Sequence, residues 1–471
     1  MLTVKAGSLP GQTLNVLHNF TNSPDGAMVW GGLVQSGATL YGTTRDGGTN
    51  GDGTIFSVNV DGSGFKKLHN FSATNSPDGY RPYAAMLLLG DTLYGTAAAG
   101  GDTNVTPLAG GIVFALNTNG TGYQVIHTFS IAEGQFPHGR LVSDGVTLYG
   151  TTLGAGSTGW GALFSVGTNG LGFTVLHTFS APTPANGTGV NADGDQPWGG
   201  MVLAGDTLYG TASEAGQSAS GVVFSISTNG DNYSVMHSFS ATGFDSVFGL
   251  TNSDGAIAIG GLAISGDTLY GTTRNGGLQG GGTIFSIATN GNNFAVLHSF
   301  TTNSLDGRGP WSELLVGGST LFGTTERGGI ANRGTVFSLG TNGNNFTLLR
   351  GFTNGFEPSS PVSGLLLSGN TLFGTSSLGG SVNGGTVFSL SLPLPVITGI
   401  QISGTSLNLN ATTGIAGQYA LLTSADVTLP FSQWTPLVTN TVNGPGAFSF
   451  TLSNAISPAA TRGFYVLRST R

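Results

Sequence analysis

The chain has 471 residues, a formal net charge of −8 at pH 7 and a pI near 5.2. Its 14 Lys and Arg form no basic stripe, which argues against nucleic acid or anionic membranes as partners. The absence of cysteine excludes disulfides, thiolate catalysis and cysteine-bound zinc. Hydrophobic residues make up 38% of the chain and can form a core, and 82 glycines without a triplet period are typical of short strands joined by tight turns.

Targeting signals are sparse. The first residues, MLTVKAGSLPGQ, lack the apolar segment of a signal peptide, and no run reaches the ~18 apolar residues of a membrane span. We expect a monomeric extracellular or cell-surface protein, seen here in a mature or truncated form.

One pattern recurs seven times with a period of 51 to 61 residues. It reads roughly L-x-x-[SG]-G-x-T-L-[YF]-G-T, then G-[TVIA]-x-F-[SA], then [LIM]-[HR]-x-F. The aromatic residues of the first motif are Tyr41, Tyr94, Tyr149, Tyr209, Tyr270, Phe322 and Phe373. A repeat of this length is one supersecondary unit that must pack against its neighbours.

Each repeat contains four short segments rich in β-branched and aromatic residues and bounded by Gly, Asp and Asn. In the first repeat these segments are residues 32–35, 39–44, 54–59 and 65–71. Four strands per repeat predict the blades of an all-β propeller. A β-solenoid is the alternative, and helices should be few because no sustained 3.6-residue apolar period occurs.

The two ends of the repeat region are complementary. Residues 13–20 form a third-motif strand without the two earlier motifs, and the last repeat lacks a third motif. Pairing residues 13–20 with residues 386–390 completes a seven-bladed β-propeller over residues 13–390 and removes an open sheet edge.

Loop lengths vary on one predicted face only. The connections that lead from the fourth strand to the next first strand, and from the second strand to the third, lie on that face. They carry the insertions at 103–110, 182–194 and 242–253. Variable loops on a rigid scaffold are the usual place for binding.

An acidic residue recurs in the loop before each first strand. These residues are Asp25, Asp78, Glu133, Asp193, Asp254, Asp306 and Glu357, and five positions later come Trp30, Tyr83, His138, Trp198, Ile259, Trp311 and Val362. One interpretation is architectural, with Asp-Gly turns and aromatic wedges between blades. The other is a ring suited to sugars, for which we predict Trp30, Tyr83, His138, Trp198, Trp311, Asp193 and Asp195 as ligand-binding residues.

Six histidines occupy the third motif, at His18, His69, His127, His177, His237 and His298, with Arg350 in the seventh position. This strand should be outermost, so the histidines are spread round the rim and cannot converge on one metal ion. We expect each to make a structural hydrogen bond within its blade.

A catalytic alternative rests on His138, Tyr83, Arg81 and Arg140. A histidine and a tyrosine could serve as base and acid, and arginine could neutralise a uronate carboxylate, as a polysaccharide lyase requires. Pairs within the acidic ring would instead suit a glycosidase. No G-x-S-x-G, P-loop or H-E-x-x-H motif is present.

The repeat ends at residue 390, and Pro393 and Pro395 mark a linker. Residues 396–471 contain six alternating segments, which predict a small antiparallel β-sandwich of the immunoglobulin or fibronectin III type. Trp434 is expected in its core.

The motifs Thr39-Leu40-Tyr41-Gly42-Thr43-Thr44, Gly53-Thr54-Ile55-Phe56-Ser57 and Leu68-His69-Asn70-Phe71 resemble the Gloeo/Verruco tandem repeat. The resemblance covers about residues 13–390 and implies an exported choice-of-anchor repeat protein with a C-terminal anchoring or sorting region. It implies no catalytic residues.

These features favour an extracellular or cell-surface binding or scaffold protein, with glycans or other extracellular macromolecules as partners. The alternative is a carbohydrate-active enzyme, a polysaccharide lyase or glycosidase. We expect no cofactor and no metal, with a bound cation such as calcium as the alternative.

Overall fold

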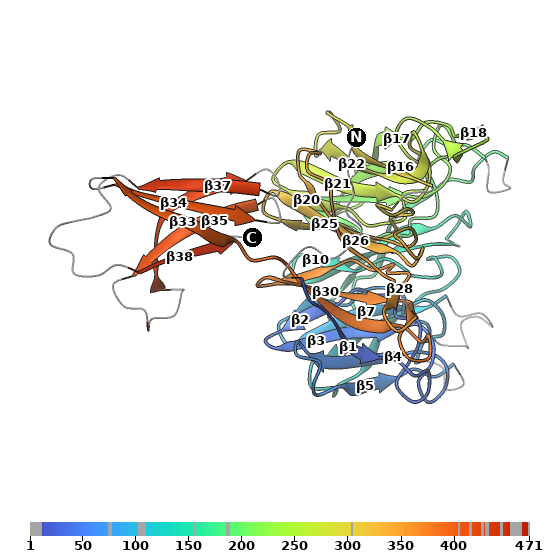
Figure 1. Ribbon diagram of the computed structural model, residues 1–471. Helices are drawn as coiled ribbons and strands as arrows, with labels where there is room; N and C mark the ends of the chain where they lie inside the picture. Colours follow the sequence, from blue (N-terminus) through green and yellow to red (C-terminus); the bar gives the residue numbers. More distant parts are fainter. Residues whose placement is uncertain are drawn as a thin grey trace.

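The computed structural model describes residues 12–73, 78–101, 110–154, 156–184, 189–302, 305–353, 355–403, 406–413, 417–424, 428, 433–442, 446–452 and 464–469. In these residues the elements are all β-strands, and no α-helix occurs, where the sequence predicts few helices (Figure 1). The larger part consists of seven four-stranded antiparallel sheets in the described residues, here called sheets 1 to 7 in chain order.

The first three sheets follow the order of the chain. Sheet 1 contains β2 (Val34–Ser36), β3 (Thr39–Thr44), β4 (Thr54–Asn59) and β5 (Lys66–Asn70). Sheet 2 contains β6 (Leu87–Leu89), β7 (Thr92–Ala97), β8 (Ile112–Asn117) and β9 (Gln124–Thr128). Sheet 3 contains β10 (Val142–Ser143), β11 (Thr147–Thr152), β12 (Ala162–Gly167) and β13 (Thr174–Thr178).

The next three sheets repeat this order. Sheet 4 contains β14 (Val202–Ala204), β15 (Thr207–Ala212), β16 (Val222–Ser227) and β17 (Ser234–Ser238). Sheet 5 contains β20 (Ala263–Ser265), β21 (Thr268–Thr273), β22 (Gly280–Ala288) and β23 (Ala295–Thr301). Sheet 6 contains β24 (Leu315–Gly317), β25 (Thr320–Thr325), β26 (Thr335–Gly340) and β27 (Thr347–Gly351).

Sheet 7 combines the two ends of the repeat region. It contains β29 (Leu366–Ser368), β30 (Thr371–Ser376), β32 (Thr386–Ser391) and β1 (Leu14–Asn19). Strand β1 pairs antiparallel with β32, with Val16 opposite Phe388. A hydrophobic cluster of sheets 1 and 7 includes Phe20, Phe56 and Phe373, so the chain start packs between its first and last repeats.

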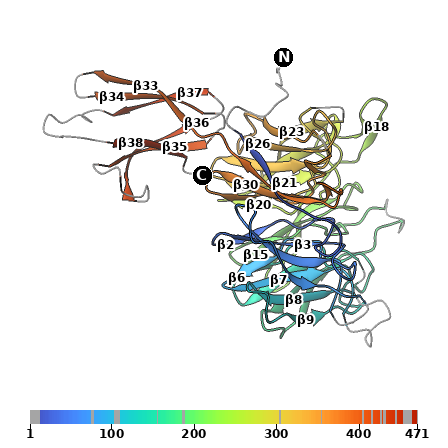
Figure 2. The same cartoon turned by 60° about the horizontal axis from the view of Figure 1, so that its bottom comes forward.

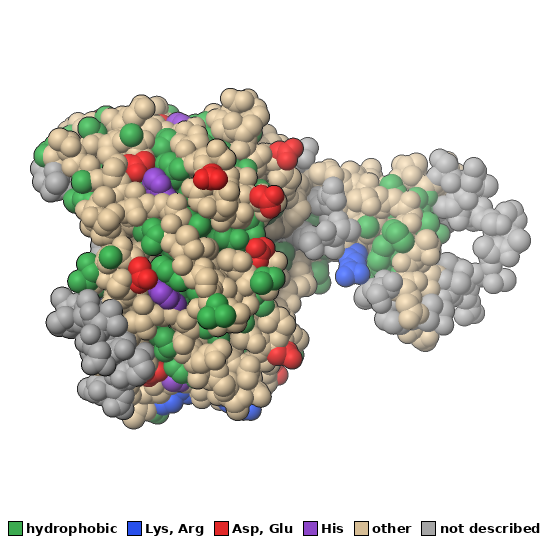
Figure 3. Space-filling model, turned by 180° about the vertical axis from the view of Figure 1, so that it is seen from behind, with side chains coloured by type: hydrophobic (Ala, Val, Ile, Leu, Met, Phe, Trp, Pro, Cys, Tyr) green, Lys and Arg blue, Asp and Glu red, His purple; other side chains and the backbone are tan. Residues whose placement is uncertain are grey.

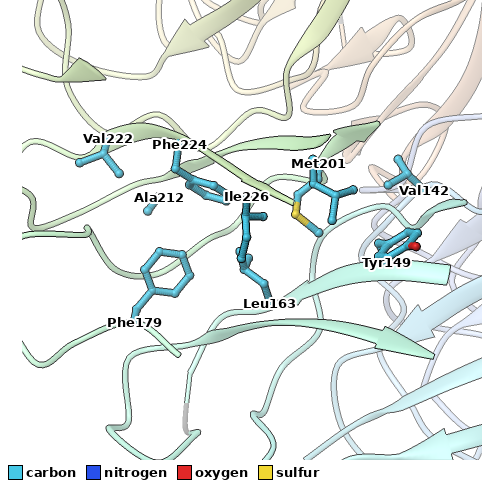
Figure 4. Packing of buried hydrophobic residues seen from close by; sticks show 10 residues of the cluster. Val142, Tyr149, Leu163, Phe179, Met201, Ala212, Val222, Phe224 and Ile226 are labelled. Atoms are coloured by element: carbon cyan, nitrogen blue, oxygen red, sulfur yellow. The ribbon is translucent and has the colours of Figure 1, made fainter. Parts of the chain in front are cut away.

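Neighbouring sheets pack face to face through their apolar side chains. Figure 4 shows the contact of sheets 3 and 4, where Val142, Tyr149 and Leu163 meet Met201 and Phe224. Because the side chains of each sheet fill the space beside the next, no repeat can bury its core alone.

Threonine hydroxyls link the sheets near the centre. Each donates to a backbone carbonyl of the following sheet: Thr43 to Ala84, Thr151 to Gly199, Thr211 to Gly260, Thr272 to Ser312, Thr324 to Ser363 and, from sheet 7 back to sheet 1, Thr375 to Gly31. The distances are 3.0–3.3 Å. In sheet 2 the equivalent hydroxyl of Thr96 is buried without a partner.

The sheets have two different faces. The loop face carries the connections from fourth to first and from second to third strands, including the hairpin of β18 (Gly243–Asp245) and β19 (Gly249–Thr251) and the pair β28 (Pro358–Ser359) and β31 (Leu378–Gly379). The turn face carries the short hairpins. Of the predicted insertions, residues 103–109 and 185–188 lie outside the described part of the chain.

The C-terminal strands form two three-stranded sheets, ordered β33-β34-β37 and β36-β35-β38. They are β33 (Val396–Ser403), β34 (Ser406–Thr413), β35 (Gly417–Ser424), β36 (Thr435–Val442), β37 (Gly446–Leu452) and β38 (Phe464–Ser469). One cluster joins Leu409 and Phe450 of the first sheet with Tyr419 and Leu421 of the second. Figures 1 and 2 show these strands on the side opposite the β18–β19 hairpin, that is, beyond the turn face.

The sequence supplies a matched test of the threonine links, because residues 92–97 and 207–212 are both Thr-Leu-Tyr-Gly-Thr-Ala. Thr211→Val removes a buried hydrogen bond and leaves a carbonyl unpaired, which should lower the free energy of unfolding by about 1–2 kcal/mol. Thr96→Val removes an unpartnered hydroxyl and should be neutral or stabilising. Guanidinium chloride unfolding measures both, and equal losses would contradict the role given to these bonds.

Candidate functional site

The segments that lead into the first strands of all seven sheets line a central cavity of about 500 Å³. Its lining includes Gly32 and Leu87 from sheets 1 and 2, and Leu315 and Leu366 from sheets 6 and 7. The cavity therefore belongs to the assembled repeats rather than to any one of them.

Five aromatic side chains form a closed circuit at the loop-face end of this cavity. Ring centroids lie 5.6 Å apart for Trp30–Tyr83, 4.1 Å for Tyr83–His138 and 4.7 Å for His138–Trp198. The circuit continues at 6.4 Å for Trp198–Trp311 and closes at 5.8 Å for Trp311–Trp30. These five predicted residues, here called the aromatic cluster, come from five different sheets and are brought together by the structure.

Glycine permits the close approach that creates the cluster. A Cβ atom on Gly31 would lie 2.6 Å from the Ala84 carbonyl oxygen, and one on Gly199 would lie 2.7 Å from the backbone nitrogen of Gly261. Both glycines directly follow a tryptophan. The backbones of adjacent sheets are thus in contact next to the tryptophans. The tryptophan rings project into the central cavity.

Two buried polar atoms of the aromatic cluster, Trp30 Nε1 and His138 Nδ1, have no hydrogen-bond partner among the described residues. Burial, followed by the charge of Arg45, lowers the pKa of His138 to about 3. The imidazole is therefore neutral at physiological pH. The Arg45 guanidinium carbon lies 5.7 Å from the Trp30 ring and 5.2 Å from the Tyr83 ring, within cation–π range.

A charged pair crosses the cavity behind the aromatic cluster. Arg140 Nη1 of sheet 3 lies 3.7 Å from Glu313 Oε1 of sheet 6. The corresponding positions in the other sheets hold Gly32, Ala85, Gly200, Gly261 and Gly364. The small residues leave room inside the cavity. Arg140 and Glu313 place one positive and one negative group in that room.

The predicted ring of acids does not join the aromatic cluster. Instead, each acid pairs with the third-motif residue of its own repeat at the rim, where Figure 3 shows histidines beside acidic side chains. The distances from His Nε2 to carboxylate oxygen are 2.9–3.6 Å for His18–Asp25, His69–Asp78, His127–Glu133, His177–Asp193, His237–Asp254 and His298–Asp306. Arg350 pairs with Glu357. Each histidine also stacks on an aromatic ring of the following repeat, as His69 does on Tyr123.

Asp195 differs from its neighbours. It is 1% exposed, and neither of its carboxylate oxygens has a hydrogen-bond partner in the part of the chain that the structure describes. Its backbone forms an antiparallel bridge with Glu214. Burial, then the charges of Glu214 and Asp193, raise the pKa of Asp195 to about 7. Glu214 also has a raised pKa because of burial.

Arg81 of the catalytic alternative does not line the central cavity. Its side chain is 51% exposed, with Nε 3.8 Å from Asp46 Oδ1 and the guanidinium 5.9 Å from the Tyr80 ring. Sequence reasoning missed Arg45 and Arg274, which contact the aromatic cluster. The signal was present, since both follow the same Tyr-Gly-Thr-Thr motif.

Among the described residues no group of three or more His, Asp or Glu side chains is arranged to hold a metal ion. Within the same residues, no helix has the length and hydropathy needed to span a membrane.

The raised pKa of Asp195 predicts a pH-dependent stability. The unfolded carboxyl ionises near pH 4 and the folded one near 7, so the folded protein should lose stability as the pH rises between these values. Asp195→Asn removes this loss and should raise the melting temperature at pH 8 by at least about 2 °C, with little effect at pH 4.5.

Asp193→Asn is the control of opposite sign. Burial would raise the pKa of Asp193, but hydrogen bonds from His177 and Ser180 lower it overall, so this carboxylate stabilises the fold at neutral pH. The control should therefore melt earlier than wild type at pH 8. A lower melting temperature for Asp195→Asn at pH 8 would contradict the assignment.

Solved structures with some similarity to this chain have low identity to it. An oligogalacturonate lyase from Vibrio parahaemolyticus is 12% identical over 83% of this chain and 98% of that chain, with a TM-score of 0.49. TolB from Acinetobacter baumannii is 14% identical over 65% of this chain and 62% of that chain, with a TM-score of 0.37. No match was found among curated proteins.

The repeats themselves match a family model, the Gloeobacter/Verrucomicrobia repeat, over residues 6–191 and 243–429. These two segments cover more than half of the chain. They include Trp30, Tyr83, His138 and Trp311 of the aromatic cluster, and Trp198 lies between the two segments. The chain belongs to the Gloeobacter/Verrucomicrobia repeat family.

Proposed function

We propose that sheets 1 to 7 are the blades of a closed seven-bladed β-propeller over residues 13–390, followed by a β-sandwich over residues 396–471. The threonine bond from Thr375 to Gly31 and the pairing of β1 with β32 support closure. The single hydrophobic cluster shared by the two C-terminal sheets supports the sandwich.

We further propose that the protein is an extracellular or cell-surface binding or scaffold protein whose ligand is a glycan. The observation that carries this proposal is the aromatic cluster, with two buried, unpartnered polar atoms at its rings. Sugars present apolar faces that stack on aromatic rings and hydroxyls that need hydrogen-bond partners. Trp30 Nε1 could donate to such a hydroxyl, and neutral His138 could accept from one.

The arrangement of the two parts fits this role. Strand β32 ends at the turn face, and the C-terminal strands follow it there. The loop face, with the aromatic cluster, therefore points away from the C-terminal part. We propose that the C-terminal part serves as a spacer or attachment module.

An enzyme acting on polysaccharides is the second candidate, favoured by the 4.1 Å approach of Tyr83 and His138. Its weakness is chemical. A general base works best with a pKa near the working pH, and a pKa of about 3 makes His138 a poor one. Arg140 is also already paired with Glu313. Binding without turnover is the better account of this geometry.

Trp198→Ala and Trp311→Ala should each weaken glycan binding about tenfold or more, because each removes a stacking surface from the aromatic cluster. A glycan array identifies the ligand, and titration calorimetry then measures the variants. Leu171→Ala is the control, since Leu171 is 71% exposed on the turn face.

Turnover is tested on the same samples by absorbance of unsaturated products from uronate polymers, with His138→Ala as the comparison. Robust product release lost in that variant would replace the binding proposal with the lyase. Absence of binding to any glycan would remove the glycan as ligand.

A further inference from the structure

A second, smaller cavity of about 150 Å³ lies on the loop face between sheets 5 and 6. Three arginines line it: Arg274 from the end of β21, Arg308 from the loop before β24, and Arg327 after β25. The whole chain has only 14 Lys and Arg and a net charge of −8. Three arginines around one small cavity therefore make this site positive on a protein that is negative as a whole.

Two of these arginines face each other at a position that every repeat shares. Here the loop before the first strand forms an antiparallel bridge with the residue beyond the second strand. In sheet 6 the partners are Arg308 and Arg327, joined by backbone bonds of 2.9 and 3.2 Å. The partners elsewhere are Ala27–Asp46, Tyr80–Ala99, Gln135–Gly154, Asp195–Glu214, Ala256–Asn275 and, in a two-residue ladder, Ser359–Leu378. Like charges directly opposite destabilise a strand pair unless something neutralises them.

The described lining contains too little negative charge for this. Glu326 is the acidic residue among the described residues that line the cavity, and it is already shared. Its Oε2 lies 3.3 Å from Arg274 Nη2 and its Oε1 lies 3.4 Å from Arg327 Nε. Among the residues that the structure describes, the acceptor of Arg308 is a neutral one, with Nη2 3.5 Å from Asn332 Oδ1. The buried hydroxyl of Thr302, also in the lining, finds no hydrogen-bond partner within the described part of the chain.

We propose that this cavity, the arginine pocket, binds the anionic group of an acidic glycan, a carboxylate or a sulfate ester. This rests on the proposed glycan-binding function and specifies its ligand. Guanidinium groups bind such planar or tetrahedral oxyanions with paired hydrogen bonds, and the Thr302 hydroxyl can add a donor. Arg274 connects the arginine pocket to the aromatic cluster, because its guanidinium carbon lies 4.4 Å from the Trp311 ring centroid. One sugar can therefore lie at the rings while the charged group of a neighbouring sugar sits between the arginines.

The test compares polymers that differ only in charge. Titration calorimetry is run with dextran sulfate against dextran, and with polygalacturonate against its methyl ester. Wild-type protein should bind at least one charged polymer about tenfold more tightly than its neutral partner, and added salt should reduce the difference. The pair that shows the preference identifies sulfate or carboxylate as the group.

Arg308→Gln and Arg327→Gln should each abolish most of this preference. Lys66→Gln is the charge-matched control, because Lys66 is an exposed residue of β5 outside both cavities. In the absence of anion, each arginine variant should melt no earlier than wild type, since it removes a like-charge pair. This separates lost binding from lost folding.

Inorganic sulfate tests the arginine pocket without any glycan. Sodium sulfate should stabilise wild type more than Arg308→Gln, relative to sodium chloride of equal ionic strength. If sulfate stabilises wild type and Arg308→Gln equally, and charged and neutral polymers bind equally well, the arginine pocket is not an anion site. Glycan binding itself would not be contradicted by that result. If no polymer binds but the sulfate effect is specific to wild type, the glycan function fails and the anion site holds.

Discussion

The structure depends on the close approach of neighbouring sheets near the centre. There a threonine hydroxyl on the second strand of one sheet reaches a backbone carbonyl just before the first strand of the next sheet. These bonds lie in the most crowded part of the molecule, and glycines such as Gly31 and Gly199 make the approach sterically feasible. Because the last of them joins Thr375 to Gly31, the chain of contacts returns to its start. The space left at the centre, and the rings gathered at its end, are consequences of that geometry.

At the rim a second set of contacts fixes the loops. Each histidine–acid pair ties the fourth strand to the loop that leads into the next first strand, and the stacked ring ties the same histidine to the following repeat. The carboxylates of Asp25, Asp193 and Asp254 have lowered pKa values because hydrogen bonds outweigh the effect of burial. Polar contacts outside the core thus hold the loop face in place. Its exposed positions do not take part in these contacts.

Much of this could be predicted from the sequence because the repeat contains it seven times. The strand positions follow from alternating patterns, and the pairing of the histidines follows from their place on an outer strand. The convergence of Trp30, Tyr83, His138, Trp198 and Trp311 follows from equivalent positions in a ring. The sequence predicts that Asp193 is available for sugars beside these rings, but Asp193 bonds His177 instead, since a partly buried histidine needs a partner.

What could not be predicted depends on contacts that the motifs do not encode. Arg308 and Arg327 are 19 positions apart and meet only through an isolated bridge, which has no sequence signature. Asp195 and Glu214 meet in the same way in sheet 4. The burial of both oxygens of Asp195 depends on the packing of the surrounding loops, and a pattern of residue types gives no measure of that.

These bridges have an evolutionary consequence. Each is held by main-chain hydrogen bonds, so almost any side chain can occupy its two positions, as the contrast between Asp195–Glu214 and Arg308–Arg327 demonstrates. A single substitution at one of these two positions can invert the local electrostatic potential, while the main-chain hydrogen bonds of the bridge remain. The surface charge of the loop face can therefore differ from one repeat to the next while the backbone contacts between repeats stay the same.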